Sequence, residues 1–271
     1  MTFPLRRAVE ADANAFGAAK HFERLRGLAM FPADELRTYV VNLRRRPDRR
    51  QRMQRILPAD LRAGYTSDWD GPFDGARLDL AALHRHGYGL FPWRLDIDHR
   101  WWGRPLRFGE IGCMISHIHC WRDAWLSTAT ACLILEDDIN LAPDFSERLQ
   151  AGFEAVTQDD GPTLIYLGRD PQEPDKGSRN GIASPGFSYG TYGYMVNRAG
   201  IEAFLSTDPH RDIIPADEFL PAMYLDHPRS DVRARYPKQL RALAYAPPLV
   251  VQLPKREAGS DTELSEFVSI H

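Results

Sequence analysis

The sequence predicts an α/β fold in which helices flank a mostly parallel central sheet. Short apolar segments rich in β-branched residues recur along the chain, and segments with helical spacing of apolar residues separate them. The 271 residues, 43% of them hydrophobic, are enough for one sizeable core. No internal repeat is visible. We therefore expect a main domain at 37–271 that carries an extension at 1–36.

The extension at residues 1–36 is expected to be helical. Phe16, Phe22 and Leu25 recur at helical spacing and predict an amphipathic helix laid on the core. The segment lacks the continuous apolar run of a signal peptide, and no run in the chain has the length of a transmembrane helix. The three cysteines have no disulfide-like spacing, so a reducing, cytoplasmic location is expected.

The main domain is expected to begin with a strand, a basic turn and a helix. "TYVVNL" (38–43) is β-branched and apolar, which predicts a buried strand. It runs into "RRRPDRRQRMQRIL", where Pro47 suits the first position of a helix and Asp48 suits its first turn. A short helix is expected at 76–86. The stretch 87–107 is rich in Pro, Gly and Trp and is expected to form a loop over a cleft.

Strands and helices are expected to alternate through the rest of the chain. Apolar residues near one face predict a long helix over 108–126, and a buried strand follows at 131–135. The later elements are expected to be a helix at 142–156, strands at 162–168 and 188–197, a helix at 198–206, an acidic turn at 214–220 and a last strand at 243–253. This alternation favours a parallel sheet.

Three consecutive acids, Glu136, Asp137 and Asp138, follow the strand at 131–135. Side chains alternate along an extended chain, so Glu136 and Asp138 should point one way and Asp137 the other. Ligands of open α/β sheets bind beyond the carboxyl ends of strands, where two carboxylates can share Mg²⁺ or Mn²⁺. Such a cation would neutralise the diphosphate of a substrate. The alternative is a solvated acidic turn.

The basic turn "NLRRRPDRR" supports an anionic ligand. It places Arg44, Arg45, Arg46 and Arg49 between a strand end and a helix N-terminus. Free N–H groups and the helix dipole attract an anion there, and arginine adds forked donors. The alternative is an exposed basic face that meets nucleic acid, which the net charge of −3 disfavours. We therefore expect no nucleic-acid partner.

Two later acid clusters are candidates for catalysis. A general base must be a carboxylate or histidine that no metal occupies, and Asp217 or Glu218 of "IPADEFL" would fit. "GSDTE" offers Asp261 near the C-terminus. The structural alternatives are a helix cap for Asp217 and an acid in a mobile tail for Asp261.

Other site patterns are weaker. Cys113, His117 and Cys120 lie at i, i+4 and i+7 on one helix side and could imitate a metal site. No second ligand pair follows at a zinc-like spacing, so packing of the helix is expected. The chain has no G-x-S-x-G, P-loop or Rossmann glycine pattern, which weakens hydrolase, NTPase and dehydrogenase interpretations.

The blocks "VVNLRRRPDRRQRM", "GEIGCMISHIHCW" and "LILEDDI" resemble, in that order, the signatures of glycosyltransferase family 25. That family contains lipooligosaccharide galactosyltransferases and procollagen (hydroxylysine) galactosyltransferases. "LIYLGRD", "SYGTYGYMVNRAGIEAFL", "IPADEFLPAMYLDHP" and "GSDTELS" resemble the collagen-type members more closely. The resemblance spans about residues 38–265.

The resemblance implies a GT-A-type nucleotide-sugar-binding fold, a UDP-sugar donor with UDP-galactose favoured, Mn²⁺, and inversion at the sugar carbon. On matching positions, the turn from Asn42 to Arg46 and Asp70 of "DWDG" would hold the nucleotide, beside Arg49 of the same basic turn. Glu136 and Asp138 would be the metal-binding acids.

Asp217 and Glu218 match the family's "DEFL" acids, and Asp261 matches its "SDTE" acid. The collagen-type enzymes carry a histidine-containing stretch before that acid, whereas "VVQLPKREAG" has none, which adds weight to Asp261 as a metal ligand. Trp and Tyr residues in 88–102 and 189–194 are candidates for stacking on sugars.

The leading hypothesis is a metal-dependent, inverting galactosyltransferase that acts on a glycan, as in lipopolysaccharide biosynthesis, or on a hydroxylysine-like protein hydroxyl. The first alternative is an inactive nucleotide-sugar-binding or adhesion-like relative. The second is a metal-dependent phosphoesterase, for which water would be the acceptor.

Overall fold

A computed structural model describes residues 34–269 of the chain. The helix expected within the extension at 1–36 therefore lies outside the described residues. The first strand, β1, begins at Leu36, one position before the expected start of the main domain.

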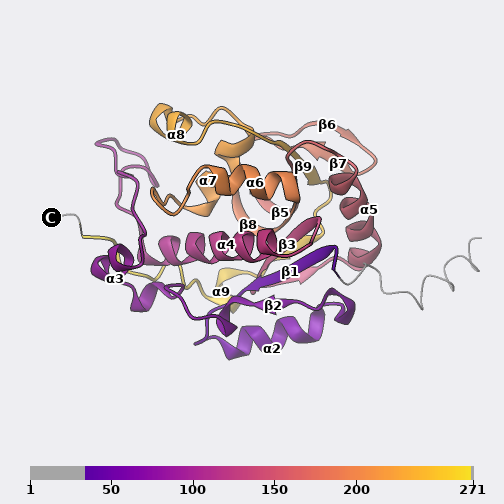
Figure 1. Ribbon diagram of the computed structural model, residues 1–271, viewed down its shortest axis with the longest axis horizontal. Helices are drawn as coiled ribbons and strands as arrows, with labels where there is room; N and C mark the ends of the chain where they lie inside the picture. Colours follow the sequence, from indigo (N-terminus) through magenta and orange to yellow (C-terminus); the bar gives the residue numbers. More distant parts are fainter. Residues whose placement is uncertain (1–33, 270–271) are drawn as a thin grey trace, which may run out of the picture.

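One large sheet and one small sheet organise the described chain (Figure 1). Over residues 34–269, eight strands form the large sheet in the order β2-β1-β3-β8-β5-β9-β7-β6. Their bounds are β1 Leu36–Val41, β2 Gly64–Tyr65, β3 Ala131–Glu136, β5 Thr163–Pro171, β6 Lys176–Arg179, β7 Ile182–Ser184, β8 Ser188–Asn197 and β9 Arg241–Tyr245. The small sheet pairs β4 (Ile139–Leu141) with β10 (Val250–Gln252) in antiparallel fashion.

Helices cover both faces of the large sheet, which confirms the α/β class (Figure 1). Their bounds are α2 Pro47–Ile56, α3 Leu80–Arg85, α4 Phe108–Leu126, α5 Phe145–Thr157, α6 Arg198–Ser206, α7 Ala216–Tyr224, α8 Ser230–Arg235 and α9 Lys255–Ala258. In β3, Cys132 and Ile134 join the core under α4, α6 and α7, while Leu133 and Leu135 join the core under α2 and α5. Alternate residues of a strand point to opposite faces, so a strand covered on both faces is apolar throughout.

The sheet is mixed, which corrects the expectation that it is mostly parallel. β1 is parallel to β2 and β3, and β5 is parallel to β9. β8 lies between β3 and β5 and runs antiparallel to both. A parallel neighbour requires a crossover connection, usually a helix, whereas β5 reaches β8 through the β6–β7 excursion. The architecture remains consistent with a GT-A-type fold.

Two further sequence expectations need correction. The acidic turn expected at 214–220 is the start of α7, where Pro215 precedes the helix and Asp217 and Glu218 occupy its first turn. The helix dipole favours acids at that position. The strand expected at 243–253 is divided into β9 and β10, because Pro247 and its neighbouring proline interrupt the ladder between them.

The direction of β8 brings its first residues to the carboxyl end of β3. Leu135 pairs with Gly193, so the residues before Gly193 lie beside Glu136. β10 lies close against β5 of the large sheet. A Cβ atom on Gly168 of β5 would lie only 2.2 Å from the carbonyl oxygen of Val250 in β10. Glycine at this position therefore lets β10 approach the end of the sheet.

Candidate active site

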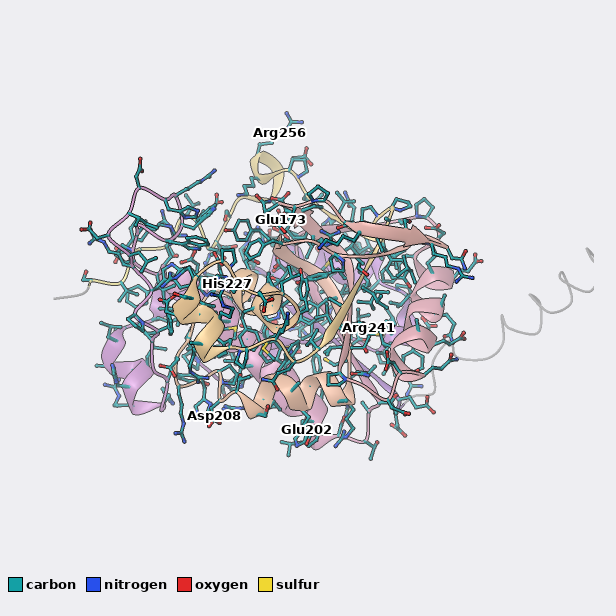
Figure 2. The ribbon with its side chains drawn as sticks, turned by 90° about the horizontal axis from the view of Figure 1, so that it is seen from above. Glu173, Glu202, Asp208, His227, Arg241 and Arg256 are labelled. Atoms are coloured by element: carbon teal, nitrogen blue, oxygen red, sulfur yellow. The ribbon has the colours of Figure 1, made fainter. Side chains whose placement is uncertain are left out.

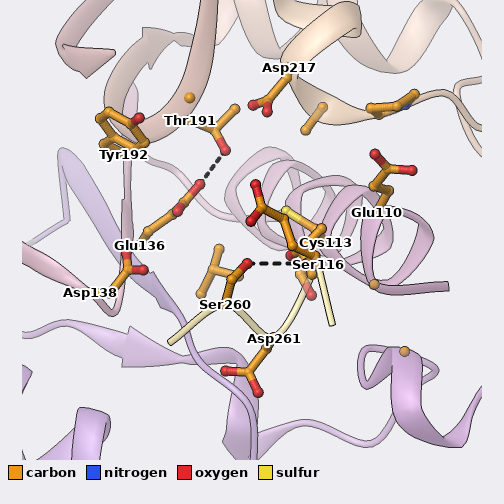
Figure 3. Close-up of a pocket in the computed structure, with 18 of the residues that line it drawn as sticks. Glu110, Cys113, Ser116, Glu136, Asp138, Thr191, Tyr192, Asp217, Ser260 and Asp261 are labelled. Atoms are coloured by element: carbon orange, nitrogen blue, oxygen red, sulfur yellow. Dashed lines mark hydrogen bonds between the residues drawn. The ribbon is translucent and has the colours of Figure 1, made fainter. Parts of the chain in front are cut away.

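A cleft with a volume of about 280 Å³ opens where β1 and β3 end. Four segments distant in sequence line it: the turn after β1, the acids after β3, the first turn of α7 and the segment after α9. The first turns of α4 complete the lining with Glu110, Cys113 and Ser116 (Figure 3). The sequence analysis placed candidate site residues in each of these four segments, and the structure brings the four segments together.

Glu136 stands at the tip of β3 with few partners. The Thr191 hydroxyl of β8 donates a hydrogen bond to its carboxylate (Figure 3). Burial, and next the charge of Asp138, raise the pKa of Glu136 to about 8. A carboxylate in a low-dielectric site beside a like charge is unfavourable, so Glu136 retains a proton at neutral pH unless a cation approaches.

Asp137 and Asp138 have different surroundings. Asp137 accepts from Arg49 Nη1 and from Asn42 Nδ2, each at 2.7 Å. Asp138 accepts one 3.3 Å hydrogen bond, from Gln252 Nε2, and its Oδ1 atom is buried with no partner. Burial raises the pKa of Asp138, although Arg49 Nη1 lies 3.7 Å from its Oδ2 atom. Asp137 is therefore a structural acid, and Asp138 is an acid with an unsatisfied oxygen.

The basic turn reaches the cleft as predicted, but its residues differ in role. Arg49 lines the cleft beside Arg45, and its Nη2 atom donates to the Ala258 carbonyl at 2.7 Å. Asn42 lies beneath the cleft, buried against Asp137. Arg46 is not among the lining residues. Arg45 and Arg49 are thus the guanidinium groups placed to meet a bound anion.

Asp261 faces the arginines, which corrects its assignment as a metal ligand. Its carboxylate accepts hydrogen bonds from Arg45 Nη1 and, at 2.7 Å, from Arg46 Nη1. Arg49 Nη1 lies 3.7 Å away. The segment after α9 turns the Asp261 carboxyl toward these guanidinium groups, so both of its oxygens have cationic partners.

Glu136 and Asp138 fit part of a site for a hard divalent cation. Both supply carboxylate oxygens, and the buried Oδ1 atom of Asp138 lacks a partner that a cation would provide. Among residues 34–269, no group of three or more His, Cys, Asp or Glu side chains is arranged to hold a metal. Mg²⁺ and Mn²⁺ commonly take one or two protein carboxylates and complete their shell with water and substrate phosphates. The two acids fit that mode of binding.

Asp217 and Glu218 are adjacent in α7 but differ chemically. Asp217 faces the cleft, and burial, followed by the charges of Glu218 and Glu110, raises its pKa to about 7 (Figure 3). Both oxygens of Glu218 are occupied by Trp102, Tyr189 and His227. Of the two acids predicted as a general base, Asp217 is therefore the one that can accept a proton from a ligand.

Asp70 does not reach the cleft, contrary to its predicted place beside the nucleotide. Its side chain is 98% exposed and pairs with Arg44 at 3.2 Å. The turn that carries Asp70 projects outward, and the guanidinium of Arg44 bonds along it to the carbonyls of Ser67 and Trp69.

Aromatic residues from the two predicted ranges line the end of the cleft near Asp217. They are Trp93, Trp101, Tyr189 and Tyr192. The rings of Trp101 and Tyr189 meet edge to face, 6.1 Å apart. The sequence therefore identified this aromatic wall, although stacking on a sugar stays a prediction.

Several cleft residues were missed. Thr191 reaches Glu136 through the antiparallel register of β8, and Gln252 reaches Asp138 through β10; no sequence motif marks either contact. Glu110 had a signal, because it stands in the first turn of α4 and accepts from the Arg107 backbone N–H at 2.8 Å. Of the metal-like trio on α4, two residues are explained by packing, because His117 bonds the Tyr194 hydroxyl and Cys120 is in the core, whereas Cys113 lines the cleft.

Comparisons with known proteins agree on one family. Residues 94–168 match the model of "Glycosyltransferase family 25 (LPS biosynthesis protein)". The chain is 34% identical over 238 residues to "Inactive glycosyltransferase 25 family member 3" of Homo sapiens, covering 84% of this chain and 39% of that protein. It is 35% identical over 242 residues to "Procollagen galactosyltransferase 1-A" of Xenopus laevis, covering 84% and 38%. It is 32% identical over 263 residues to "Glycosyltransferase 25 family member" of Drosophila melanogaster, covering 93% and 41%.

The chain spans about two fifths of the length of these relatives. Within residues 34–269, none of the helices combines the length and the hydropathy that a membrane span requires.

Proposed function

The chain belongs to glycosyltransferase family 25, and from this premise we propose that it transfers galactose from UDP-galactose to an acceptor hydroxyl, with a divalent cation and inversion at the anomeric carbon. One observation carries the proposal: a single cleft holds two arginines, two acids with few hydrogen-bond partners and a carboxyl with a pKa of about 7. Anion binding, cation binding and proton transfer are the three tasks that such a reaction needs.

The donor end of the cleft is assigned to the diphosphate. Arg45 and Arg49 would bind its oxygens through charge-assisted hydrogen bonds. Glu136 and Asp138 would hold Mn²⁺ or Mg²⁺, which when bound neutralises the negative charge that the departing UDP acquires. Asp137, fixed by Arg49 and Asn42, orients the acids on either side of it.

The acceptor end is assigned to Asp217. Its carboxylate would take the proton of the acceptor hydroxyl while the hydroxyl oxygen forms a bond to the anomeric carbon. The bond from that carbon to the UDP oxygen breaks on the opposite side, and UDP leaves with the electron pair. A pKa near 7 suits a base that works at neutral pH, because deprotonated Asp217 is then well populated.

The acceptor is proposed to be a hydroxyl of a glycan or of a protein side chain. The name of the matching family model includes LPS biosynthesis, and the name of the Xenopus relative includes procollagen. A cytoplasmic location is part of the proposal. In the described structure, the thiols of Cys113, Cys120 and Cys132 are free, which supports a reducing compartment.

The direct test is UDP release from UDP-galactose with Mn²⁺, assayed with and without a panel of glycan and hydroxylysine acceptors. We expect the Asp138→Ala variant to lose Mn²⁺-dependent binding of UDP in calorimetry and to lose UDP release. The matched control is Asp70→Ala, which removes an exposed acid outside the cleft. Undiminished release by a folded Asp138→Ala variant would refute the role of this acid.

A second candidate function is donor binding without transfer. It is favoured by the 34% identity to a human relative whose name calls it inactive. In that case UDP with Mn²⁺ would bind in calorimetry, yet neither transfer nor hydrolysis would follow. The carboxyl of Asp217, which faces the cleft, argues for activity.

A further inference from the structure

Glu218 is a buried acid at the acceptor end that the proposed reaction does not use. It is 2% exposed and follows Asp217 in the first turn of α7. Its Oε1 atom accepts from Trp102 Nε1 at 2.9 Å and from the Tyr189 hydroxyl at 3.3 Å. Its Oε2 atom lies 2.8 Å from His227 Nε2. Hydrogen bonds fill both oxygens of this buried carboxyl group, so the network makes Glu218 a fixed link between three segments.

The hydrogen-bond network defines the tautomer of His227. Its Nδ1 atom accepts from the Arg229 backbone N–H at 3.1 Å, so this nitrogen carries no proton. Nε2 therefore carries the proton and donates it to Glu218. His227, labelled in Figure 2, is fully buried and follows α7 in the chain. Glu218 thus accepts three hydrogen bonds, which a carboxylate can do and a neutral amide in its place cannot.

The buried network of Glu218, His227 and Arg229 holds the loop 93–104 at both of its ends. Glu218 binds the Trp102 indole at one end. At the other end, Arg229 Nη1 donates to the Trp93 carbonyl at 2.6 Å, and its guanidinium lies 4.5 Å from the centre of the Trp93 ring. Trp93 and Trp101 of this loop line the cleft. The loop has no helix or strand of its own, so these anchors, together with the ion pair of Arg104 with Glu110, hold it in place.

We propose that Glu218 is a positioning residue, which fixes the Trp101 side of the loop and Tyr189 of β8 as one acceptor-binding wall beside Asp217. The proposal rests on the proposed function, because that function assigns this end of the cleft to the acceptor. Glu218 joins the two sides of the wall: it binds Tyr189 directly and holds Trp101 through the neighbouring Trp102. Asp217 is the preceding residue of α7, so the wall and the base share one support.

Removing single bonds from this network should affect acceptor binding and spare donor binding. Trp102→Phe and Tyr189→Phe each keep a ring and remove one donor to Glu218. Glu218→Gln keeps the shape and sets an amide N–H against the N–H of His227. Because a hydrogen bond to a charged group is lost, we expect each variant to raise the acceptor KM about tenfold. Effects acting through the same carboxylate should not add in the double variant Glu218→Gln/Trp102→Phe.

The experiment combines three measurements on the full chain. Hydrogen exchange by mass spectrometry reports on loop 93–104, with helix 108–126 as an internal reference. Calorimetry gives the affinity for UDP with Mn²⁺. Kinetics compares hydrolysis of UDP-galactose by water with transfer to methyl β-galactoside, methyl β-glucoside or free hydroxylysine. Trp125→Phe and Tyr65→Phe, both outside the cleft, are matched controls.

We expect the rate of amide hydrogen exchange in loop 93–104 to rise about tenfold in Glu218→Gln and in Trp102→Phe, while the exchange rate of helix 108–126 stays unchanged. UDP affinity and donor hydrolysis should stay within about twofold, and transfer should fall through the acceptor KM. Unchanged loop exchange in both variants would overturn the proposal. So would an equal loss of hydrolysis and transfer, because Glu218 would then act on the chemical step.

The proposed function and the proposed role of Glu218 can fail separately. If wild-type chain neither binds UDP nor hydrolyses UDP-galactose, the proposed function fails, and loop exchange still decides whether Glu218 holds the wall. If Glu218→Gln does not fold, Trp102→Phe and Tyr189→Phe answer the same question with the carboxylate in place.

Discussion

Two sets of acids face one cleft and differ in what surrounds them. At the arginine turn, Asp137 and Asp261 each accept hydrogen bonds from two nitrogen groups. On either side of Asp137, the side chains of Glu136 and Asp138 have one hydrogen bond each, and one oxygen of Asp138 has none. The pKa of Asp217, which also faces the cleft, is raised by burial and by neighbouring acids.

This difference in hydrogen bonding separates the acids that hold the cleft together from the acids that can bind a ligand. Burial raises the pKa of Asp137 as well, but Arg49 and Asn42 oppose that shift and satisfy its oxygens. Glu136 has a hydroxyl and a like charge beside it instead. Acids with complete partners build the cleft, whereas acids without them destabilise the empty cleft and stabilise a bound cation or accept a proton. The predictions that follow test this division.

The largest effect is expected at Asp217. Asp217→Asn removes the base and keeps the shape, so transfer should fall by about 10²- to 10⁴-fold while UDP affinity stays within about twofold. Steady-state transfer kinetics and calorimetry measure the two quantities. The control is Asp226→Asn, an exposed acid paired with Lys238 beyond α7. Transfer by Asp217→Asn at half the wild-type rate would remove this residue from the mechanism.

Arg49 should contribute strongly to the stability of the fold through its ion pair with Asp137. Arg49→Met leaves Asp137 buried without its guanidinium partner, so the free energy of unfolding should fall by about 3–5 kcal/mol. Urea unfolding measures the change. The control is Arg52→Met one turn away in α2, whose guanidinium bonds Asn140 at the surface, with an expected loss below about 1 kcal/mol. Equal losses in both variants would contradict the paired role of Asp137.

Glu136→Gln should stabilise the metal-free protein at high pH. The pKa of Glu136 is raised in the fold to about 8, so its stabilising contribution is complete below pH 4.5 and is lost as pH rises to 8. A neutral amide avoids that loss, and we expect a gain of about 2 kcal/mol at pH 8.5 and none at pH 4, allowing for exposure to the cleft. Urea unfolding at the two pH values measures it.

The control for this change is Glu202→Gln on the outer surface of α6 (Figure 2), which should leave stability unchanged at either pH. Added Mn²⁺ should stabilise the wild-type protein more than Glu136→Gln. A gain of the same size at both pH values would mean that the charge of Glu136 is not what destabilises the cleft.

The smallest predicted effect is the pH profile of transfer. Because the pKa of Asp217 is raised to about 7, its basic form is lost as pH falls below that value. The rate should drop about tenfold per pH unit below 7 and level off above it. Kinetics between pH 5.5 and 8.5 at saturating Mn²⁺ and donor measures the profile. A rate that is flat across this range would point to a different proton acceptor.

The sequence predicted the parts of the site that rely on local pattern. The strand into Glu136 was visible because a strand covered on both faces is apolar throughout, and α4 was predicted with its observed bounds. The basic turn after β1 was visible because Pro47 marks the start of α2. These features depend on residues within about two turns of one another, which propensity and periodicity describe.

The parts that failed depend on contacts between distant segments. Asp261 binds Arg45 and Arg46 across more than 200 positions, and no local pattern distinguishes an acid near a metal from an acid near arginines. Thr191 reaches Glu136 only because β8 runs antiparallel to β3. Glu218 and Asp217 are adjacent in sequence, yet only the fold gives one of them three hydrogen-bond partners from distant residues.

The contact between Arg49 and the carbonyl of Ala258 has a consequence for biosynthesis. The arginine turn is translated more than 200 residues before the segment that receives it. Until that segment has been made, the cleft is incomplete and Arg49 lacks this partner. Long-range closure of this kind is slow relative to local folding, so competence to bind a donor arises only after translation has passed α9.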